Sequence, residues 1–154
     1  MRKLTGFAFV SLGLLAGCGS SDNASTSRDE QALNQSAARF VVRVQADLRL
    51  GKFQRAWRSL HPAEQRVVSA KRLASCYPRK EFPETVTFRA TQSEDVDWLV
   101  PGTTDSVETK EVTVTAKSPG AKAETFTQHV VRVGGQWKWM LSKTFFDKAR
   151  RGAC

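Results

Sequence analysis

Apolar residues recur with two different periods along the chain, one typical of helices and one typical of strands. Over residues 33–48 they return every three or four positions, which predicts one long amphipathic helix. Gly51 follows as a stop signal, and residues 53–60 repeat the helical pattern up to Pro62. The first half of the chain is therefore predicted to be helical.

Two short segments, 62–68 and 69–76, predict one broken helix or two short ones. Pro62 suits the first position of a helix, and Ser69 is a candidate cap for the second segment. His61 precedes the proline at a helix end, where capping is expected rather than catalysis. The residues expected to face the core here are Val67, Val68 and Leu73.

After Pro83 the period falls to two, as expected for strands. The candidate strands are residues 85–90, 95–100, 107–117, 124–133 and 136–143. Gly134 and Gly135 form a tight-hairpin signal between the last two, and such short turns favour antiparallel neighbours. We therefore expect an α+β fold in which helices precede a meander of about four or five strands.

A helix carrying Phe40 and Val44, a Gly-aromatic turn within residues 50–57 and a Trp-containing strand at 134–139 follow one another along the chain. This order resembles the nuclear transport factor 2-like superfamily over residues 33–143. The resemblance implies N-terminal helices packed in a strongly curved, mainly antiparallel sheet that forms a cone. It also implies an apolar pocket in the cone, where enzymes of the superfamily hold a carboxylate or histidine base.

The first eighteen residues have the layout of a secretory signal, with two basic residues, the apolar run 4–15 and a small-residue end. Leu15-Ala16-Gly17-Cys18 resembles a bacterial lipobox. The resemblance implies removal of residues 1–17, thioether lipidation of Cys18 and acylation, for example with palmitate, of its new amino terminus. The protein is then expected to be lipid-anchored in the bacterial cell envelope, facing outward. The alternative is a plain secretory signal with an incidental cysteine.

Residues 18–30 are then the lipidated cysteine and a flexible tether, and residues 31–154 form a single domain. Beyond residue 17, 22 Lys and Arg stand against 15 Asp and Glu, so the mature chain is basic. A basic helical face on a tethered protein suits anionic headgroups, wall polymer or an envelope protein, although such a face can also serve solubility alone. Because the protein is expected to face the outside of the cell, nucleic acid is excluded as a partner.

Two cysteines follow Cys18, namely Cys76 and Cys154, and an even pair in an oxidising compartment predicts a disulfide between them. Two unrelated thiols are the alternative. Neither cysteine has a second cysteine or a histidine at zinc-ligand spacing, and no cofactor motif is present. We therefore expect neither a metal nor a cofactor.

No catalytic motif stands out, so a pocket is the most specific site that the sequence suggests. Its possible residues are Trp57, Tyr77, Asp97, His129, Trp137 and Trp139. The alternation around His129 does not determine to which face of the sheet its side chain points. Asp95 and Asp97 share one face of their strand, which is either solvated or provides a general base. Trp137 and Trp139 are expected in the core, with a ligand-stacking wall as the alternative.

These observations predict a membrane-anchored envelope lipoprotein with a small, non-catalytic binding or accessory domain. One alternative is a small pocket enzyme of isomerase or dehydratase type that uses His129, Asp97 or Tyr77. Another is a cell-wall-associated sensing or accessory module. An open pocket lined by a buried histidine or aspartate favours the enzyme, whereas a filled cone favours binding at the surface.

Overall fold

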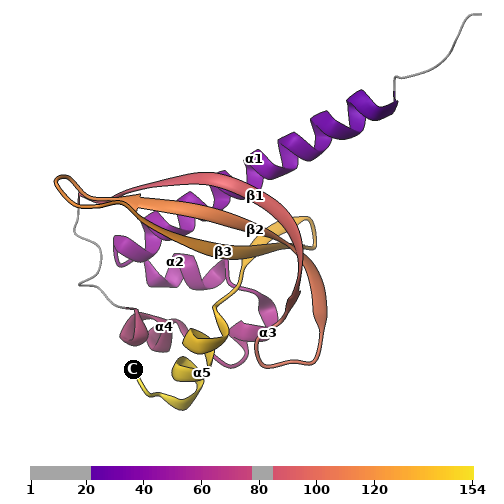
Figure 1. Cartoon of the computed structure of the whole chain (residues 1–154). Coiled ribbons are helices and arrows are strands. Elements are labelled where there is room, and N and C mark those ends of the chain that lie inside the picture. The colour runs from indigo at the N-terminus through magenta and orange to yellow at the C-terminus, as the bar shows by residue number, and fades with distance from the viewer. Residues whose placement is uncertain (1–21, 78–84) are drawn as a thin grey trace, which may run out of the picture.

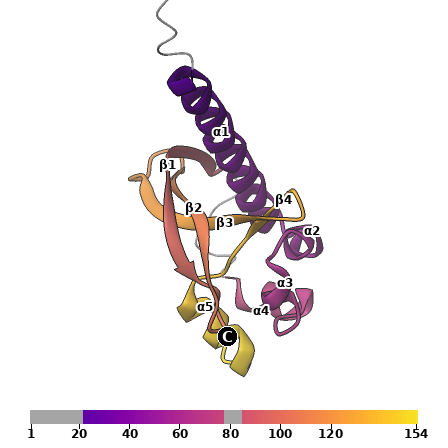
Figure 2. The ribbon, with the colours of Figure 1, turned by 90° about the vertical axis from the view of Figure 1, so that its right-hand side faces the viewer.

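The computed structural model describes residues 22–77 and 85–154, which form an α+β fold (Figures 1 and 2). The elements in chain order are α1 (Asp22–Arg49), α2 (Phe53–Arg58), α3 (Pro62–Gln65), α4 (Ala70–Cys76), β1 (Thr87–Leu99), β2 (Ser106–Lys117), β3 (Glu124–Val133), β4 (Gln136–Trp139) and α5 (Lys143–Arg151). Cys18 and the segment before it lie outside the described residues. Among those residues, no helix combines the length and the apolar character needed to cross a bilayer.

Helix α1 begins at Asp22, so it occupies most of the segment 18–30 in which we expected a flexible tether. The chain has neither glycine nor proline from this point to Arg49, which lets the helix extend beyond its buried stripe. Its N-terminal turns project past the sheet in both views, and Arg28 and Glu30 are exposed (Figures 1 and 2). The buried stripe itself follows the predicted period and consists of Ala37, Phe40, Val41, Val44 and Leu48.

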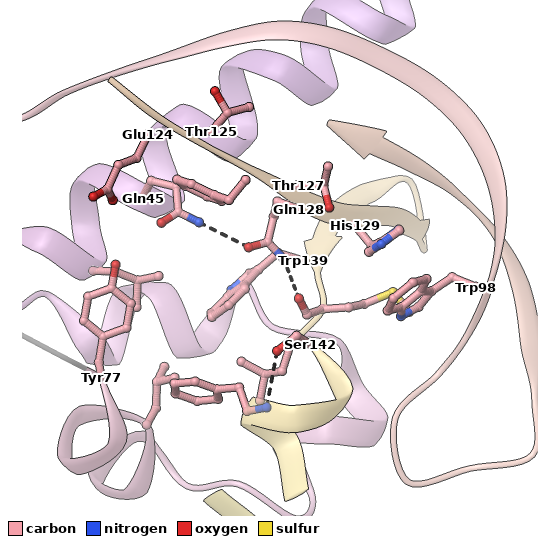
Figure 3. Close-up of a pocket in the computed structure, with 16 residues that line it drawn as sticks. Gln45, Tyr77, Trp98, Glu124, Thr125, Thr127, Gln128, His129, Trp139 and Ser142 are labelled. Carbon is pink, nitrogen blue, oxygen red and sulfur yellow. Dashed lines mark hydrogen bonds between the residues drawn. The ribbon is translucent and has the colours of Figure 1, made fainter. Parts of the chain in front are cut away.

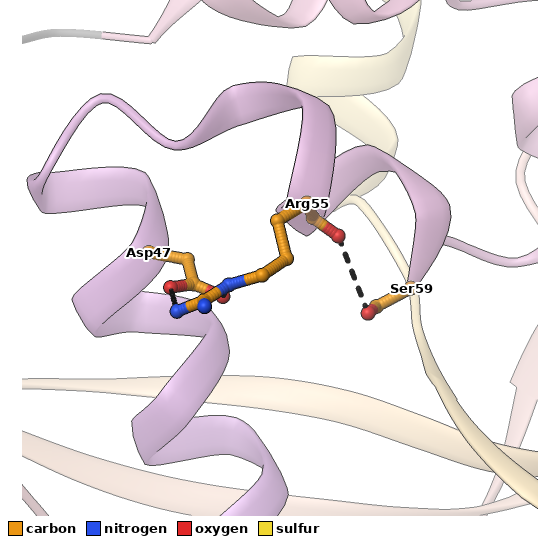
Figure 4. A network of polar contacts seen from close by, with 3 residues as sticks. All are labelled: Asp47, Arg55 and Ser59. Carbon is orange, nitrogen blue, oxygen red and sulfur yellow. Dashed lines mark hydrogen bonds and ion pairs between the residues drawn. The ribbon is translucent and has the colours of Figure 1, made fainter.

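A compact turn joins α1 to α2. Gly51 lies in this turn at a φ of 70°, a conformation that glycine adopts without strain. Arg55 donates two hydrogen bonds to the buried carboxylate of Asp47, one of them 2.6 Å long from Nε (Figure 4). Ser59 Oγ in turn donates to the Arg55 carbonyl at 3.4 Å. The bidentate ion pair therefore fixes the course of the chain from the first helix into the second.

The short helices α3 and α4 are capped by side chains. His61 Nδ1 accepts a hydrogen bond from the Ala63 N–H at 3.3 Å, so the histidine caps the start of α3. The sequence predicted a capping role for His61, but at the end of the preceding helix. Ser69 Oγ accepts from the Arg72 N–H at 3.2 Å and caps α4 as predicted.

Two of the three residues expected to face the core between these helices do so. Val68 and Leu73 are fully buried. The prediction for Val67 was wrong, because α3 ends at Gln65 and Val67 is exposed in the turn that follows.

The four strands form one antiparallel sheet in the order β1-β2-β3-β4. The candidate strands 85–90 and 95–100 belong to one continuous strand, β1. A bulge between Ala90 and Gln92 shifts its register against β2. A bulge adds one residue and reverses the side-chain alternation, which explains the break in the sequence pattern. Gly134 and Gly135 form the predicted turn between β3 and β4.

The C-terminal strand was predicted too long. Strand β4 ends at Trp139, and helix α5, which the sequence analysis did not predict, begins at Lys143. Ser142 caps this helix by accepting a hydrogen bond from the Phe145 N–H at 3.2 Å. The helix then buries one side of its surface through Phe146 and Ala149.

The buried apolar side chains form one cluster that draws on α1, α2, α4, the strands β2 to β4, and α5. Trp139 is only 3% exposed, and its Nε1 donates to the Ala56 carbonyl at 2.8 Å, which ties β4 to α2. Beyond α5, Cys154 is bonded to Cys76 at the end of α4, with their Cα atoms 4.7 Å apart. This is the cysteine pair that the sequence predicted, and it closes the C-terminus against the helical half.

Candidate functional site

A pocket of about 470 Å³ lies between helices α1 and α4, strand β3 and the segment that joins β4 to α5 (Figure 3). Its aromatic lining includes Tyr77, Trp139 and Phe145. Its polar side is the first part of β3, from Glu124 to His129. Aromatic walls with a few convergent polar groups are the usual setting for a bound ligand.

Two glutamines inside the pocket form a chain of hydrogen bonds. Gln45 on α1 donates from Nε2 to Gln128 Oε1 at 3.1 Å, and Gln128 Nε2 donates to the Met140 carbonyl (Figure 3). Gln45 is buried, and a buried amide is stable only when its polar atoms have partners. Each amide therefore orients the next, and the relay joins α1, β3 and the segment before α5.

The same relay marks where the pairing of β3 with β4 ends. Val133 pairs with Gln136 at one end of the ladder, and Val130 pairs with Trp139 at the other. One residue further, the Met140 N–H still donates to the His129 carbonyl at 3.0 Å. The Met140 carbonyl, which would otherwise continue the ladder, accepts the Gln128 side-chain amide instead. Beyond this point the chain leaves β3 and turns into α5.

His129 is buried beside two polar groups. Its Nε2 lies 3.2 Å from Glu111 Oε2, and its Nδ1 lies 3.4 Å from Thr109 Oγ1. Burial lowers the pKa of His129 to about 4, so the ring is neutral at neutral pH. The Glu111 carboxylate favours the charged ring, but its side chain is 24% exposed and screened by water, so burial has the larger effect.

One face of the His129 ring is also covered. The ring stacks on Trp98 with a centroid separation of 3.5 Å and an interplanar angle of 19°. The Trp98 Nε1 is buried without a hydrogen-bond partner among the described residues. Histidine and tryptophan therefore form one stacked unit at the end of the pocket.

A second cavity, of about 570 Å³, lies between the β1–β2 turn and α5. Trp98 lines both cavities, and the exposed apolar residue Leu99 lies at the second one. The charged residues of this cavity pair with one another, since Asp147 lies 2.9 Å from Lys143 Nζ and 3.9 Å from Arg150. The first pocket is the better candidate because it combines aromatic walls with the amide and hydroxyl groups of β3, whereas the charged groups of the second cavity pair with one another.

Glu64 on α3 is a buried carboxyl that the sequence analysis missed. Its two Oε atoms lie 3.1 and 3.2 Å from the Leu141 backbone nitrogen, which donates to them. Burial raises the pKa of Glu64 to about 8, while the hydrogen bond from Leu141 acts in the opposite direction. Glu64 does not line either cavity, so we assign it a role in the stability of the fold rather than in the candidate site.

Three of the six possible pocket residues, Tyr77, His129 and Trp139, line the pocket. Trp57 and Trp137 instead direct their Nε1 atoms to the Val68 carbonyl at 2.6 Å and to Ser36 Oγ at 3.0 Å. Asp97 is exposed on β1, and Asp95 next to it pairs with Lys110 at 2.5 Å. The acidic face of β1 is thus solvated rather than part of the pocket.

The two glutamines were missed as site residues because an isolated glutamine carries no sequence signal. The described residues contain no group of three or more metal-ligating side chains. The site offers amide and hydroxyl groups, a neutral imidazole and aromatic surface. Comparison with known proteins finds no family model, no curated protein and no solved structure that matches the chain.

Proposed function

We propose that the protein is a lipid-anchored envelope protein whose domain binds a ligand or a protein partner in the pocket between α1, α4 and β3. The observation that carries this proposal is the pocket itself, a cavity of about 470 Å³ whose polar wall is held by the Gln45–Gln128 relay. The resemblance of Leu15-Ala16-Gly17-Cys18 to a lipobox supports the anchor. Anionic headgroups, wall polymer and an envelope protein are the candidate partners.

Binding is a better use of this pocket than catalysis. A general base needs a free ring nitrogen within reach of the substrate, but both nitrogens of His129 already face Glu111 and Thr109. Its stacked face is closed by Trp98. The isomerase or dehydratase alternative would therefore need a proton acceptor other than His129.

We propose further that the domain is a cone of the nuclear transport factor 2-like type. Support comes from contacts that join α1 to the strands, since Trp137 donates to Ser36 and Gln45 donates to Gln128. Helix α1 would then serve two purposes. Its part from Ala37 onward packs in the domain, and its N-terminal turns, residues 22–36, would hold the domain away from the membrane over about 22 Å.

The anchor is tested by metabolic labelling with a fatty-acid probe. Wild-type protein should incorporate the lipid and sediment with membranes, whereas Cys18→Ala should do neither. Cys76→Ala, which removes a cysteine from the folded domain, is the matched control and should still be labelled. An unlabelled wild-type protein released into the medium would contradict the anchor.

The pocket is tested by nuclear magnetic resonance of the chain from residue 19 onward, which contains every described residue. A library of small aromatic and amide fragments serves as the probe. We expect shifts confined to residues that line the pocket, among them Tyr77, Gln128 and His129. Fragments that bind only at the second cavity, or nowhere, would contradict the proposed site.

A further inference from the structure

Among the described residues, the first part of strand β3 has no strand paired to it on the side that faces the pocket. The strand runs from Glu124 to Val133, but β4 pairs only with Val130–Val133. On the other side β3 is paired with β2 throughout Glu124–Val130. Within the described part of the chain, residues 124–128 therefore have a strand neighbour on one side only.

The backbone groups at this edge point toward the pocket. The Met140 N–H donates to the His129 carbonyl, so His129 directs its carbonyl to the β4 side. Because backbone groups alternate along an antiparallel strand, Thr127 and Thr125 direct their N–H and carbonyl groups to that side as well. The side chains of neighbouring residues point to opposite faces, yet all of 124–129 line the pocket, so the cavity follows the edge rather than one face.

We propose that this edge binds an extended peptide segment of an envelope protein as an added strand, antiparallel to β3 and in line with β4. This inference rests on the proposed function and names the ligand class of the same pocket. Added strands gain affinity from main-chain hydrogen bonds and specificity from pockets for alternate side chains. Native proteins block unwanted pairing with lysine or proline at an edge, and residues 124–129 contain neither.

The surroundings also define the peptide. Side chains opposite Phe126 and Gln128 would face the wall of Leu73 and Trp139, so they are apolar. Those opposite Thr125 and Thr127 lie on the other face and are polar. Glu124 is exposed and takes part in none of the ion pairs of the described residues, so a basic residue fits opposite it. In an antiparallel arrangement this basic residue is at the C-terminal end of the peptide.

The probe is a synthetic five-residue peptide, blocked at both ends, in which valine alternates with threonine from opposite Gln128 and the last residue, opposite Glu124, is lysine. Two N-methylated versions test the binding mode. Methyl groups on the amides that face β3 should weaken binding about tenfold or more, because each removes a main-chain hydrogen bond. Methyl groups on the amides that face away should change the affinity about twofold or less.

Thr127→Pro tests the protein side, since proline removes the outward N–H and is tolerated on an edge strand. It should weaken peptide binding about tenfold, whereas Thr127→Val, which keeps the N–H, should have little effect. If Thr127→Pro does not fold, the N-methylated peptides with wild-type protein decide the question alone.

Equal affinity of both N-methylated peptides would overturn the added strand. Binding of fragments or a soluble wall glycan without any binding of the peptide would overturn it too, but would leave the proposed pocket intact. Self-association of the chain in sedimentation experiments, lost in Thr127→Pro, would assign the edge to a second copy instead. Failure of fragments and peptide alike would contradict the proposed function itself.

Discussion

The Glu64 carboxyl accepts the backbone N–H of Leu141, with its two oxygens 3.1 and 3.2 Å from that nitrogen. The contact joins α3 to the segment between β4 and α5, which also forms one wall of the pocket. Because burial raises the pKa of Glu64 to about 8, the side chain is mostly protonated at neutral pH. A buried neutral carboxyl thus connects two parts of the fold that are distant in sequence.

The contribution of Glu64 to the stability of the folded protein should fall as the pH rises from about 5 to 8. In this window the folded state keeps a proton on Glu64 that the unfolded chain, with a pKa of 4.5, has released. The Glu64 contribution to the free energy of unfolding should fall by up to about 1.4 kcal/mol per pH unit, while that of His129 rises up to about pH 6.5. Urea titrations at pH 5, 6.5 and 8 measure this slope.

Glu64→Gln should remove most of that slope, since the amide oxygen can still accept the Leu141 N–H and carries no charge at any pH. Glu30→Gln, at an exposed position on α1, is the control and should keep the wild-type slope. Comparing variants at each pH cancels the opposite contribution of His129, whose lowered pKa makes stability rise from about pH 4 to 6.5. Equal slopes in wild type and Glu64→Gln would contradict the assignment.

Gly102 should be the least replaceable glycine of the described turns. A Cβ at this position would lie 2.6 Å from Cζ of the buried Phe146 ring, at a φ of 84°. Gly120 has a φ of 73° and nothing within 4 Å of such a Cβ. Gly120→Ala should therefore lower the free energy of unfolding by the backbone strain alone, about 1–2 kcal/mol. Gly102→Ala should lower it by about 1–3 kcal/mol more, because the ring is in the way. Equal losses in urea unfolding would show that Phe146 moves aside freely.

The disulfide between Cys76 and Cys154 should contribute about 4 kcal/mol, because it closes a loop with a sequence separation of 78 residues. The free energy of unfolding should fall by the same amount in Cys76→Ser, in Cys154→Ser and in the double variant, since either single change breaks the bond. Intact-mass measurement before and after reduction should show a gain of two hydrogens. Two free thiols in protein isolated from the envelope, or additive losses in the double variant, would contradict the bond.

Local patterns predicted the elements whose signals lie close together in the sequence. The stripe from Ala37 to Leu48, the Ser69 cap and the Gly134–Gly135 turn each depend on neighbours within a few residues. The bulge after Ala90 concealed the continuity of β1, because a single extra residue reverses the alternation that identifies a strand.

Most of the site could not be predicted in this way. Gln45 and Gln128 are 83 positions apart, and Glu64 and Leu141 are 77 apart, so only the folded chain shows that they are partners. Glutamine and glutamate in polar stretches are typical of solvated positions, which is why their burial left no sequence signal. Tyr77, His129 and Trp139 were selected by residue type, and packing determined which of the candidates reach the pocket.

Trp139 belongs to the core and also lines the pocket. Its ring is 3% exposed and its Nε1 donates to Ala56 at 2.8 Å, so Trp139→Ala should cost about 3–5 kcal/mol and lower the melting temperature by about 8 °C or more. Trp137→Ala, which removes a partly buried ring and its bond to Ser36, is the matched control and should cost less. A shift of less than about 2 °C for Trp139→Ala would show that the ring is a ligand wall with little packing to lose. In that case the variant should keep its stability and lose fragment binding, and the pocket would extend into what we describe as core.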